Sequence, residues 1–516
     1  MPARTSLNHP LAIDSVACCG GMIGMTFCPG KRTSGTLAPS RDRDLITDMA
    51  AIRDWGASAV VSLIEDHEYA MLQVERLGEE AEAQGLEWHP LPIPDFSVPG
   101  PRFEALWLYA GHLLRWRLAR GERIVVHCRG GLGRTGMIAA RLLIETGSAP
   151  HEAIARVRAA RPGTIETVEQ DRHVRSLSPP GHEAGHLDRV LGCLLGGALG
   201  DAFGHAVEFL RLPDIRNSHG PRGLTEPVEE EGRLRVTDDT QMTLFVTEGL
   251  VHGAPALAER DREALLERVR RATQDWHRTQ TLPRPPVAAA DSLLRHEELW
   301  HRRAPGNTCL SACEAGAPGT PEAPVNASKG CGGVMRVAPV GLISGLPREE
   351  AFDLAARIAA QTHGHPTGYI AAGALAAMLG ELLRNATPRT AIAGALAVAH
   401  DWPGADETVA ALQAAERLAA ERPGAHEANI RTLGEGWVGE EALAIALYAF
   451  LSAQDFTDLL QIAANHDGDS DSTAAIAAQL WGARHGLAGM PHRWIRRLDV
   501  LEPLLDIAGR LARMRA

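Results

Sequence analysis

The chain has 516 residues, and single hydrophobic cores stop growing at about 250–300 residues, so its length excludes one compact domain. A content of 45% hydrophobic and 22% charged residues excludes a largely disordered chain. The net charge of −12 argues against broad binding to nucleic acid or to an anionic membrane. Eight cysteines without zinc-ribbon spacing, and the lack of a signal-peptide pattern, predict a soluble protein of the cytoplasm.

A Ser-, Pro- and Gly-rich segment divides the chain into a domain over residues 1–178, a linker over 179–186 and a domain over 187–516. The first domain is expected to be α/β with a parallel central sheet. Its β-rich runs predict buried strands at 57–65 and 122–128, and amphipathic stretches predict helices at 71–85, 105–121 and 137–147. The second domain is expected to be all-α, because Ala/Leu-rich helical periods dominate it, as at 367–384 and 441–466.

The second predicted strand leads directly into the segment HCRGGLGRTG and then into a predicted helix. Gly130, Gly131 and Gly133 allow backbone N–H groups to turn inward around an anion, and the start of the helix adds positive potential. The same field stabilises a thiolate nucleophile at Cys128. Arg134 offers a planar fork that holds two phosphate oxygens. The segment therefore predicts a phosphate site.

Other residues complete this site. Thr135 is expected to stabilise the thiolate when it departs, and Asp95, in the Pro-rich stretch LPIPD, is expected to be a mobile general acid. His127 is expected to be a structural hydrogen-bond partner of the loop. The phosphate-binding residues are expected to be Arg129, Gly130, Gly131, Leu132 and Gly133. A solvated acidic cluster is expected at Glu65, Asp66 and Glu68.

The segments HCRGGLGRTG, VVSLIEDHE and LPIPD resemble those of cysteine-dependent protein tyrosine and dual-specificity phosphatases. The likeness is strongest to the compact group around the cyclin-dependent-kinase inhibitor phosphatases, and it spans about residues 10–175. It implies phosphomonoester hydrolysis on a phosphorylated substrate, with no cofactor.

Two acidic clusters open helical stretches in the second domain: TDDT at 237–240 and HDGDSDST at 466–473. One or two carboxylates would serve as helix N-caps. Five carboxylates interleaved with hydroxyl groups exceed that role, and because they repel one another they indicate a hard divalent cation such as Mg²⁺. These carboxylates are Asp238, Asp239, Asp467, Asp469 and Asp471.

Five ordered motifs resemble the ADP-ribosylglycohydrolases over about residues 187–490: GCLLGGALGDAFGHAVEF, TDDTQMTL, GCGGVMRVAPVGL, THGHPTGYIAAGALA and NHDGDSDST. The resemblance implies an all-α fold with two Mg²⁺ ions at the base of an ADP-ribose cleft. In that family the metals bind the hydroxyls of the distal ribose and position a water for attack on its anomeric carbon. Carboxylates near an oxocarbenium-like transition state would stabilise its positive charge.

The resemblance also assigns residues by motif. One metal would be held by Thr237, Asp238, Asp239 and Asp471. The other would be held or bordered by Glu208, Asp469, Asp471 and Ser472. The candidate acid/base groups, which the sequence does not rank, are Glu208, Asp238 and Asp469. Backbone N–H groups for the diphosphate would come from Gly330, Cys331, Gly332 and Gly333. Arg336 would contact or brace the diphosphate, and His363 would lie near the ribose and diphosphate.

The sequence therefore predicts a bifunctional hydrolase. One half would cleave the N- or O-glycosidic bond of an ADP-ribosylated protein or small molecule, with arginine-linked substrates favoured, and the other half would hydrolyse a phosphomonoester. Two alternatives stay open. In one, only the ADP-ribosylhydrolase half is active and the phosphatase-like half binds phosphate or ADP-ribose products. In the other, the chain is a non-enzymatic reader of ADP-ribose.

Overall fold

The computed structural model describes residues 3–33, 40–180, 184–284, 288–289 and 291–516. The chain divides into two compact units, an N-terminal unit (Met1–Glu183) and a C-terminal unit (Ala184–Ala516). The N-terminal unit is α/β and the C-terminal unit is helical, which confirms the predicted fold classes. The predicted linker lies partly outside the described residues, and its last three residues belong to the first helix of the C-terminal unit.

A five-stranded sheet forms the centre of the N-terminal unit, with the strand order β1-β2-β7-β5-β6. Its strands are β1 (Asp14–Cys18), β2 (Gly21–Phe27), β5 (Ala57–Ser62), β6 (Glu87–Pro90) and β7 (Arg123–Cys128). Only β1 runs antiparallel to its neighbour among the pairs of this sheet. The two predicted strands are β5 and β7, which pair in parallel as expected. A separate short ladder joins β3 (Arg32–Thr33) to β4 (Arg41–Asp42).

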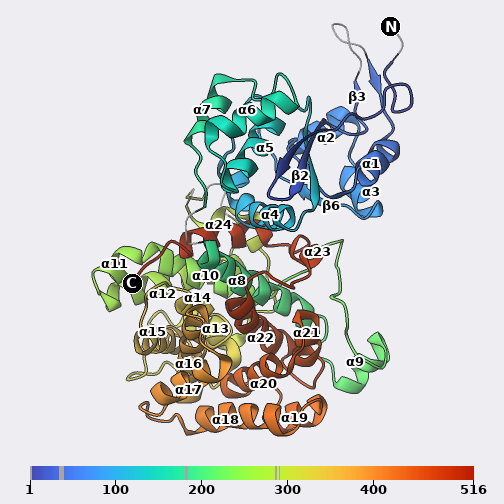
Figure 1. The fold of residues 1–516 in the computed structure, drawn as a ribbon. Helices are drawn as coiled ribbons and strands as arrows, with labels where there is room; N and C mark the ends of the chain where they lie inside the picture. The colour runs from blue at the N-terminus through green and yellow to red at the C-terminus, as the bar shows by residue number, and fades with distance from the viewer. Residues whose placement is uncertain (1–2, 34–39, 181–183, 285–287, 290) are drawn as a thin grey trace. The chain divides into compact units, whose positions relative to one another are not determined.

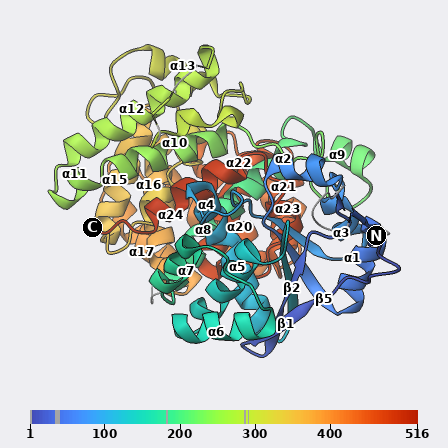
Figure 2. The same cartoon turned by 90° about the horizontal axis from the view of Figure 1, so that it is seen from above.

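Helices cover both faces of this sheet (Figures 1 and 2). One face packs against α1 (Leu45–Asp54), α2 (Asp66–Leu72) and α3 (Leu77–Ala83). The other packs against α4 (Pro101–Ala119), α5 (Gly133–Glu145), α6 (Pro150–Ala160) and α7 (Val168–Ser176). Because strand side chains alternate, Ile124 and Val126 of β7 enter one core and Val125 enters the other.

The single helix predicted over 71–85 is wrong. Helix α2 ends at Leu72, because Gln73 adopts the left-handed conformation with φ of 58°. The N–H groups of Gln73 and Val74 then bond back to carbonyls of the last turn, as at other left-handed helix ends. A new helix, α3, begins at Leu77.

The C-terminal unit is built from helices. They are α8 (Ala184–His205), α9 (Leu212–His219), α10 (Asp238–His252), α11 (Ala254–Ala258), α12 (Arg262–Thr281), α13 (Asn307–Glu314), α14 (Ala338–Gly341), α15 (Arg348–Ala360), α16 (Pro366–Leu383), α17 (Pro388–Ala399), α18 (Asp406–Glu421), α19 (His426–Leu433), α20 (Gly439–Ser452), α21 (Phe456–Ala464), α22 (Ser470–His485), α23 (His492–Ile495) and α24 (Leu501–Leu511). Between α12 and α14 the described residues also form the short 3₁₀ turns η1 (Leu293–Arg295), η2 (Glu297–Leu299) and η3 (Cys331–Gly333).

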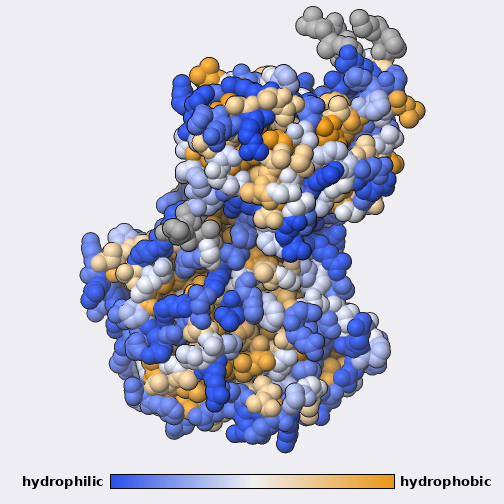
Figure 3. All heavy atoms as spheres, viewed as in Figure 1, coloured by the Kyte–Doolittle hydropathy of each residue, from blue (hydrophilic) through white to orange (hydrophobic). Residues whose placement is uncertain are grey.

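Helix α16 is the one helix of the described chain that is long and apolar enough to cross a membrane. Its apolar window is 83% buried inside the unit, as in the core helix of a globular domain. Hydrophilic side chains cover most of the face of each unit drawn in Figure 3, and hydrophobic ones are scattered between them. This pattern is typical of a folded globular surface.

Helices α8 and α22 pack side by side in opposite directions (Figure 1). Their backbones touch along a stripe of glycines at every fourth position of α8: Gly192, Gly196, Gly200 and Gly204. A Cβ atom on Gly200 would lie 2.2 Å from the Ala474 carbonyl oxygen, and one on Gly204 would lie 2.1 Å from that of Ser470. The stripe therefore brings the end of α8 against the beginning of α22.

Candidate active sites

The predicted phosphate loop connects the end of β7 to the start of α5. Cys128 is the last residue of β7, and its Sγ accepts a hydrogen bond of 3.2 Å from the Gly131 N–H. Gly131 has φ of 76°, and a Cβ atom there would lie 2.4 Å from the Thr26 carbonyl oxygen. Only glycine fits this position, so the sequence places inward-facing N–H groups around the sulfur.

Arg134, in the first turn of α5, is fully buried. It is held by the carboxylate of Glu68, which the sequence did not identify as its partner. Its guanidinium donates two hydrogen bonds to Glu68, at 2.6 and 3.0 Å. Burial would raise the pKa of Glu68, but the bonds from Arg134 outweigh burial and hold that pKa below its usual value. Glu68 is only 1% exposed, so its assignment to a solvated cluster is wrong.

The loop that carries Asp95 lies beside the guanidinium of Arg134. The Asp95 carboxylate lies 2.8 Å from the Arg134 guanidinium and 3.8 Å from that of Arg129. Thr135 is buried beside Arg134, and its Oγ1 has no hydrogen-bond partner among the described residues. Leu132 is the N-cap of α5, and its carbonyl accepts from Gly136. The structure thus brings the predicted acid and arginine together at the loop that begins at Cys128.

His127 lies behind the loop. Its Nε2 is 2.7 Å from Ser62 Oγ, which also accepts a hydrogen bond from Trp88. Burial lowers the pKa of His127 to about 3, so the ring is neutral at neutral pH. Lys31 braces the loop from the side, since its ammonium group donates to the Arg129 carbonyl at 2.7 Å. These contacts support the loop and leave the chemistry to Cys128.

In the C-terminal unit, carboxylates from three separate segments converge. They come from the segment after α8, from the start of α10 and from the start of α22, and each is less than a tenth exposed: Glu208, Asp238, Asp239, Asp469 and Asp471. Burial, with repulsion from Asp471, raises the pKa of Glu208 to about 9. Burial also holds the pKa values of Asp238, Asp239 and Asp469 well above their usual range. Such a cluster needs protons or a cation to be stable.

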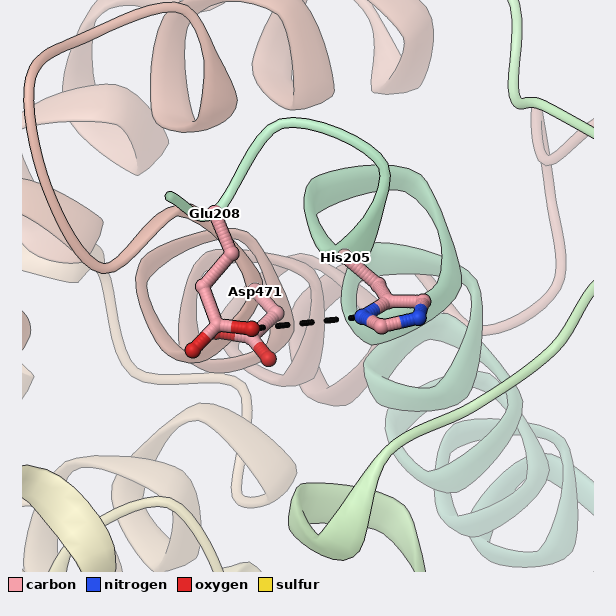
Figure 4. Close-up of side chains that lie close together, drawn as sticks. All are labelled: His205, Glu208 and Asp471. Carbon is pink, nitrogen blue, oxygen red and sulfur yellow. Dashed lines mark ion pairs between the residues drawn. The ribbon is translucent and has the colours of Figure 1, made fainter. Parts of the chain in front are cut away.

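The donor set fits a divalent cation. Among the described residues, Asp239 Oδ1 and Glu208 Oε2 are buried and accept no hydrogen bond. His205, Glu208 and Asp471 each offer one ligand atom, and these atoms lie within 4.8 Å of one another. Figure 4 shows His205 facing Glu208, with 3.9 Å between Nδ1 and Oε2. His205 was missed from the sequence, although it stands only three positions before Glu208, at the end of α8.

Asp201, also missed, organises the TDDT turn. Its fully buried carboxylate accepts the Thr237 N–H at 2.9 and 3.0 Å and the Thr240 N–H at 3.0 Å. Burial and the nearby Asp471 raise the pKa of Asp201 to about 7. An aspartate inside the otherwise apolar run GALGDAFG was the available signal. Thr237 and Ser472, the predicted hydroxyl ligands, are both buried at these helix starts.

Asp467 lies apart from this cluster. Its carboxylate accepts the Leu212 N–H at 2.7 Å and lies 3.9 Å from Arg211. Its side chain is 32% exposed. Of the five carboxylates in the two acidic motifs, four therefore belong to the buried cluster, and Asp467 is the partly exposed one.

The predicted diphosphate loop packs against the buried ring of His363. The loop comprises Gly330, Cys331, Gly332 and Gly333. A Cβ atom on Gly332 would lie 3.1 Å from the His363 ring, whose pKa burial lowers to about 3. Arg336 is 1% exposed and donates to Thr362 Oγ1 at 2.6 Å. Of its two expected roles, the geometry favours bracing. Burial, together with Asp469, holds the pKa of the Cys331 thiol well above its usual value, so the loop borders the carboxylates.

Comparisons with known proteins find a family for each half of the chain. The family model for ADP-ribosylglycohydrolase matches residues 182–516, and a model for a polymorphic toxin system DSP-PTPase phosphatase matches residues 34–148. ADP-ribosyl-[dinitrogen reductase] glycohydrolase of Rhodospirillum rubrum is 27% identical over 62% of this chain and 97% of its own. ADP-ribosylarginine hydrolase Tri1 of Serratia proteamaculans is 26% identical over 64% of this chain and 80% of its own.

The N-terminal unit has relatives of a different kind. Cyclin-dependent kinase inhibitor 3 of Mus musculus is 27% identical over 31% of this chain and 72% of its own. The chain is therefore a hydrolase in which a tyrosine or dual-specificity phosphatase-like domain is fused to a second domain. Because the family model for that second domain covers more than half of the sequence, the chain belongs to the ADP-ribosylglycohydrolase family.

Proposed function

We propose that the C-terminal unit is a magnesium-dependent ADP-ribosylhydrolase that favours arginine-linked substrates. The observation that carries this proposal is the convergence of five buried carboxylates that include oxygens without hydrogen-bond partners among the described residues. The arginine preference is supported by the relative named ADP-ribosylarginine hydrolase. The substrate is an ADP-ribosylated protein or small molecule.

Two Mg²⁺ ions would be held by the residues that the motifs assign: Thr237, Asp238, Asp239, Glu208, Asp469, Asp471 and Ser472. When bound, the metal supplies Lewis-acid chemistry and makes water a better nucleophile near neutral pH. The chain itself supplies carboxylates that stabilise the positive charge growing on the sugar. The N–H groups of the loop at 330–333 orient the diphosphate, His363 packs against that loop, and Arg336 braces Thr362, the residue before His363.

We propose that the N-terminal unit hydrolyses a phosphomonoester. The Cys128 thiolate attacks phosphorus, an S–P bond forms, and the P–O bond to the leaving group breaks as Asp95 donates a proton to that oxygen. Water then attacks phosphorus while the Asp95 carboxylate takes up a proton from it, and the S–P bond breaks to release phosphate and the Cys128 thiolate. The loop N–H groups and Arg134 bind the equatorial oxygens throughout. The short distance between Asp95 and Arg134 supports this assignment. We also place the protein in the cytoplasm, which its eight free thiols support.

A substrate panel assayed by mass spectrometry tests both activities on the full chain. It contains arginine-, serine- and nucleic-acid-linked ADP-ribose, ADP-ribose 1″-phosphate and a phosphotyrosine peptide. We expect Cys128→Ser to abolish only phosphate release and Asp471→Ala to abolish only ADP-ribose release. Loss of neither turnover would contradict both site assignments. If the full chain releases ADP-ribose but no phosphate, only the ADP-ribosylhydrolase half is active. If it binds ADP-ribose tightly but hydrolyses no substrate at saturating Mg²⁺, the chain is a non-enzymatic reader of ADP-ribose.

A further inference from the structure

One backbone N–H group of the phosphate loop already donates a hydrogen bond to a carboxylate of the same chain. Glu166 Oε2 accepts a hydrogen bond of 2.7 Å from the Gly133 N–H. Gly133 closes the loop and opens α5, so its N–H is among the donors expected to bind the substrate phosphate. One N–H cannot donate to two anions at full strength, so a phosphate oxygen that binds the Gly133 N–H would have to share it with the Glu166 carboxylate or displace that carboxylate.

The backbone around Glu166 is fixed against this loop. Ile165 adopts the left-handed conformation with φ of 60°, which is costly for a β-branched residue and persists only when its surroundings impose it. The Ile165 N–H points to the Leu132 carbonyl at 3.4 Å, and the Glu166 N–H donates to Gln170 Oε1 at 3.0 Å. These contacts fix the residue from which the carboxylate extends, although its side chain remains solvent-accessible.

Further contacts tie the same segment to both parts of the site. Arg161 donates to the Gly131 carbonyl at 2.6 Å, and Gln170 donates to the carbonyl of Ser97, two residues after the expected general acid, at 3.1 Å. A Cβ atom on Gly133 would lie only 2.6 Å from Glu166 Oε2. The approach of this carboxylate thus depends on a glycine in the loop and is part of how the site is built.

We propose that Glu166 is a specificity-determining residue of the phosphatase site, because its carboxylate competes with the substrate phosphate for the Gly133 N–H. Binding of a phosphate dianion requires this carboxylate to leave the loop, and its charge stays nearby and repels the dianion. Affinity for small, highly charged phosphates is lowered as a result. The inference rests on the phosphatase function proposed above.

Calorimetric titration of the full chain with inorganic phosphate, together with turnover of p-nitrophenyl phosphate, tests this competition. We expect Glu166→Gln to tighten the phosphate Kd about tenfold and to lower KM by a similar factor, because one unit of repulsion at contact distance is removed. The kcat is expected to change by less than about threefold, because the chemistry of the bound complex is unaffected. The glutamine oxygen still accepts the Gly133 N–H, so the loop keeps its geometry. Glu166→Ala, which also frees the N–H, is expected to tighten Kd at least as much.

The matched control is Glu169→Gln, which removes one exposed carboxylate from the first turn of α7. It is expected to leave Kd and KM unchanged. An unchanged or weakened Kd in both Glu166 variants would overturn the inference, and so would equal tightening in Glu169→Gln. Tightening without turnover in any form would refute the phosphatase function and leave the competition established. Turnover without a tighter phosphate Kd in the Glu166 variants would support the phosphatase function and refute the competition. If no form of the protein binds phosphate, both the phosphatase function and the competition are refuted.

Discussion

The Glu68 carboxylate accepts two hydrogen bonds from the Arg134 guanidinium, at 2.6 and 3.0 Å. Both residues are buried in the N-terminal unit, and neither is more than 1% exposed. Carbonyl groups of Leu63 and Ile93 accept further bonds from the same guanidinium, at 3.2 and 3.0 Å. Arg134 is thereby fixed before any phosphate arrives. Because the Arg134 guanidinium is already fixed, it loses little conformational entropy when phosphate binds, and it can stabilise the transition state at a lower entropic cost.

Replacing Glu68 by alanine leaves the buried guanidinium of Arg134 without its buried charge partner, so that only the more exposed Asp95 remains beside it. We expect Glu68→Ala to lower the free energy of unfolding of the N-terminal unit by about 3–5 kcal/mol. Phosphatase kcat/KM is expected to fall at least about hundredfold, because the fork loses its orientation. Urea unfolding and p-nitrophenyl phosphate turnover measure the two effects. Asp66→Ala, which removes an exposed carboxylate 3.4 Å from Arg102, serves as the control and is expected to shift stability by less than about 0.5 kcal/mol.

Removing a carboxylate from the buried cluster is expected to abolish metal-dependent activity. We expect Asp239→Asn to reduce ADP-ribose release at least about hundredfold, since a ligand contributes more than the residues that orient it. Mg²⁺ is expected to raise the melting temperature of the wild-type chain and not of the variant. Chelation is expected to stop the wild-type reaction until Mg²⁺ is restored. Asp467→Asn, which changes the partly exposed aspartate of the same motif, is the matched control, and a similar loss there would contradict the assignment of the ligands.

The glycine stripe of α8 predicts an unusual response to alanine. In an exposed helix interior, Gly→Ala stabilises by about 1 kcal/mol. In Gly200→Ala the new methyl group would lie 2.2 Å from the Ala474 carbonyl oxygen, so we expect a loss of about 1–3 kcal/mol and weaker Mg²⁺ binding. Thermal unfolding with and without Mg²⁺ measures both. Gly185→Ala, in the same helix but with open space around it, is expected to be neutral or slightly stabilising. Equal effects of the two changes would refute backbone contact.

Glu248 predicts how stability depends on pH. It is 2% exposed and accepts the Leu293 N–H at 2.6 Å, and burial raises its pKa from 4.5 to about 7. Between these values the folded state holds a proton that the unfolded state has lost, so the free energy of unfolding falls as pH rises. We expect Glu248→Gln to be more stabilising at pH 8 than at pH 4.5 by up to about 3 kcal/mol. Calorimetry at the two pH values checks this, with the exposed Glu259→Gln as control. A pH-independent difference would contradict the shifted pKa.

Local patterns made much of both sites predictable. The glycine spacing between Cys128 and Arg134 sets the loop, and acidic residues next to Thr237 set a helix start, all within a few residues of sequence. The strands β5 and β7 were predictable because a strand buried on both faces is a continuous apolar run. Helix types followed from periodicity in the same way.

Long-range partners made the rest unpredictable. Glu68 stands 66 positions before Arg134, and Asp201 stands 36 positions before Thr237, so no local pattern showed which partners these buried carboxylates have. The break after Leu72 depends on the left-handed conformation of Gln73, a residue with no strong preference for it. Glu166 reaches Gly133 only because the segment before α7 folds back on the loop.

The packing of α8 against α22 also has a consequence for the order in which the chain folds. These helices open and nearly close the sequence of the C-terminal unit, and contacts between such distant segments form late because a long loop must close first. During synthesis, every strand of the N-terminal sheet leaves the ribosome long before α22 does. A nascent or truncated chain that stops before Ser470 therefore carries a whole phosphate loop and no complete carboxylate cluster. Cleavage of the bond between ADP-ribose and its acceptor would therefore be the last activity that this polypeptide acquires.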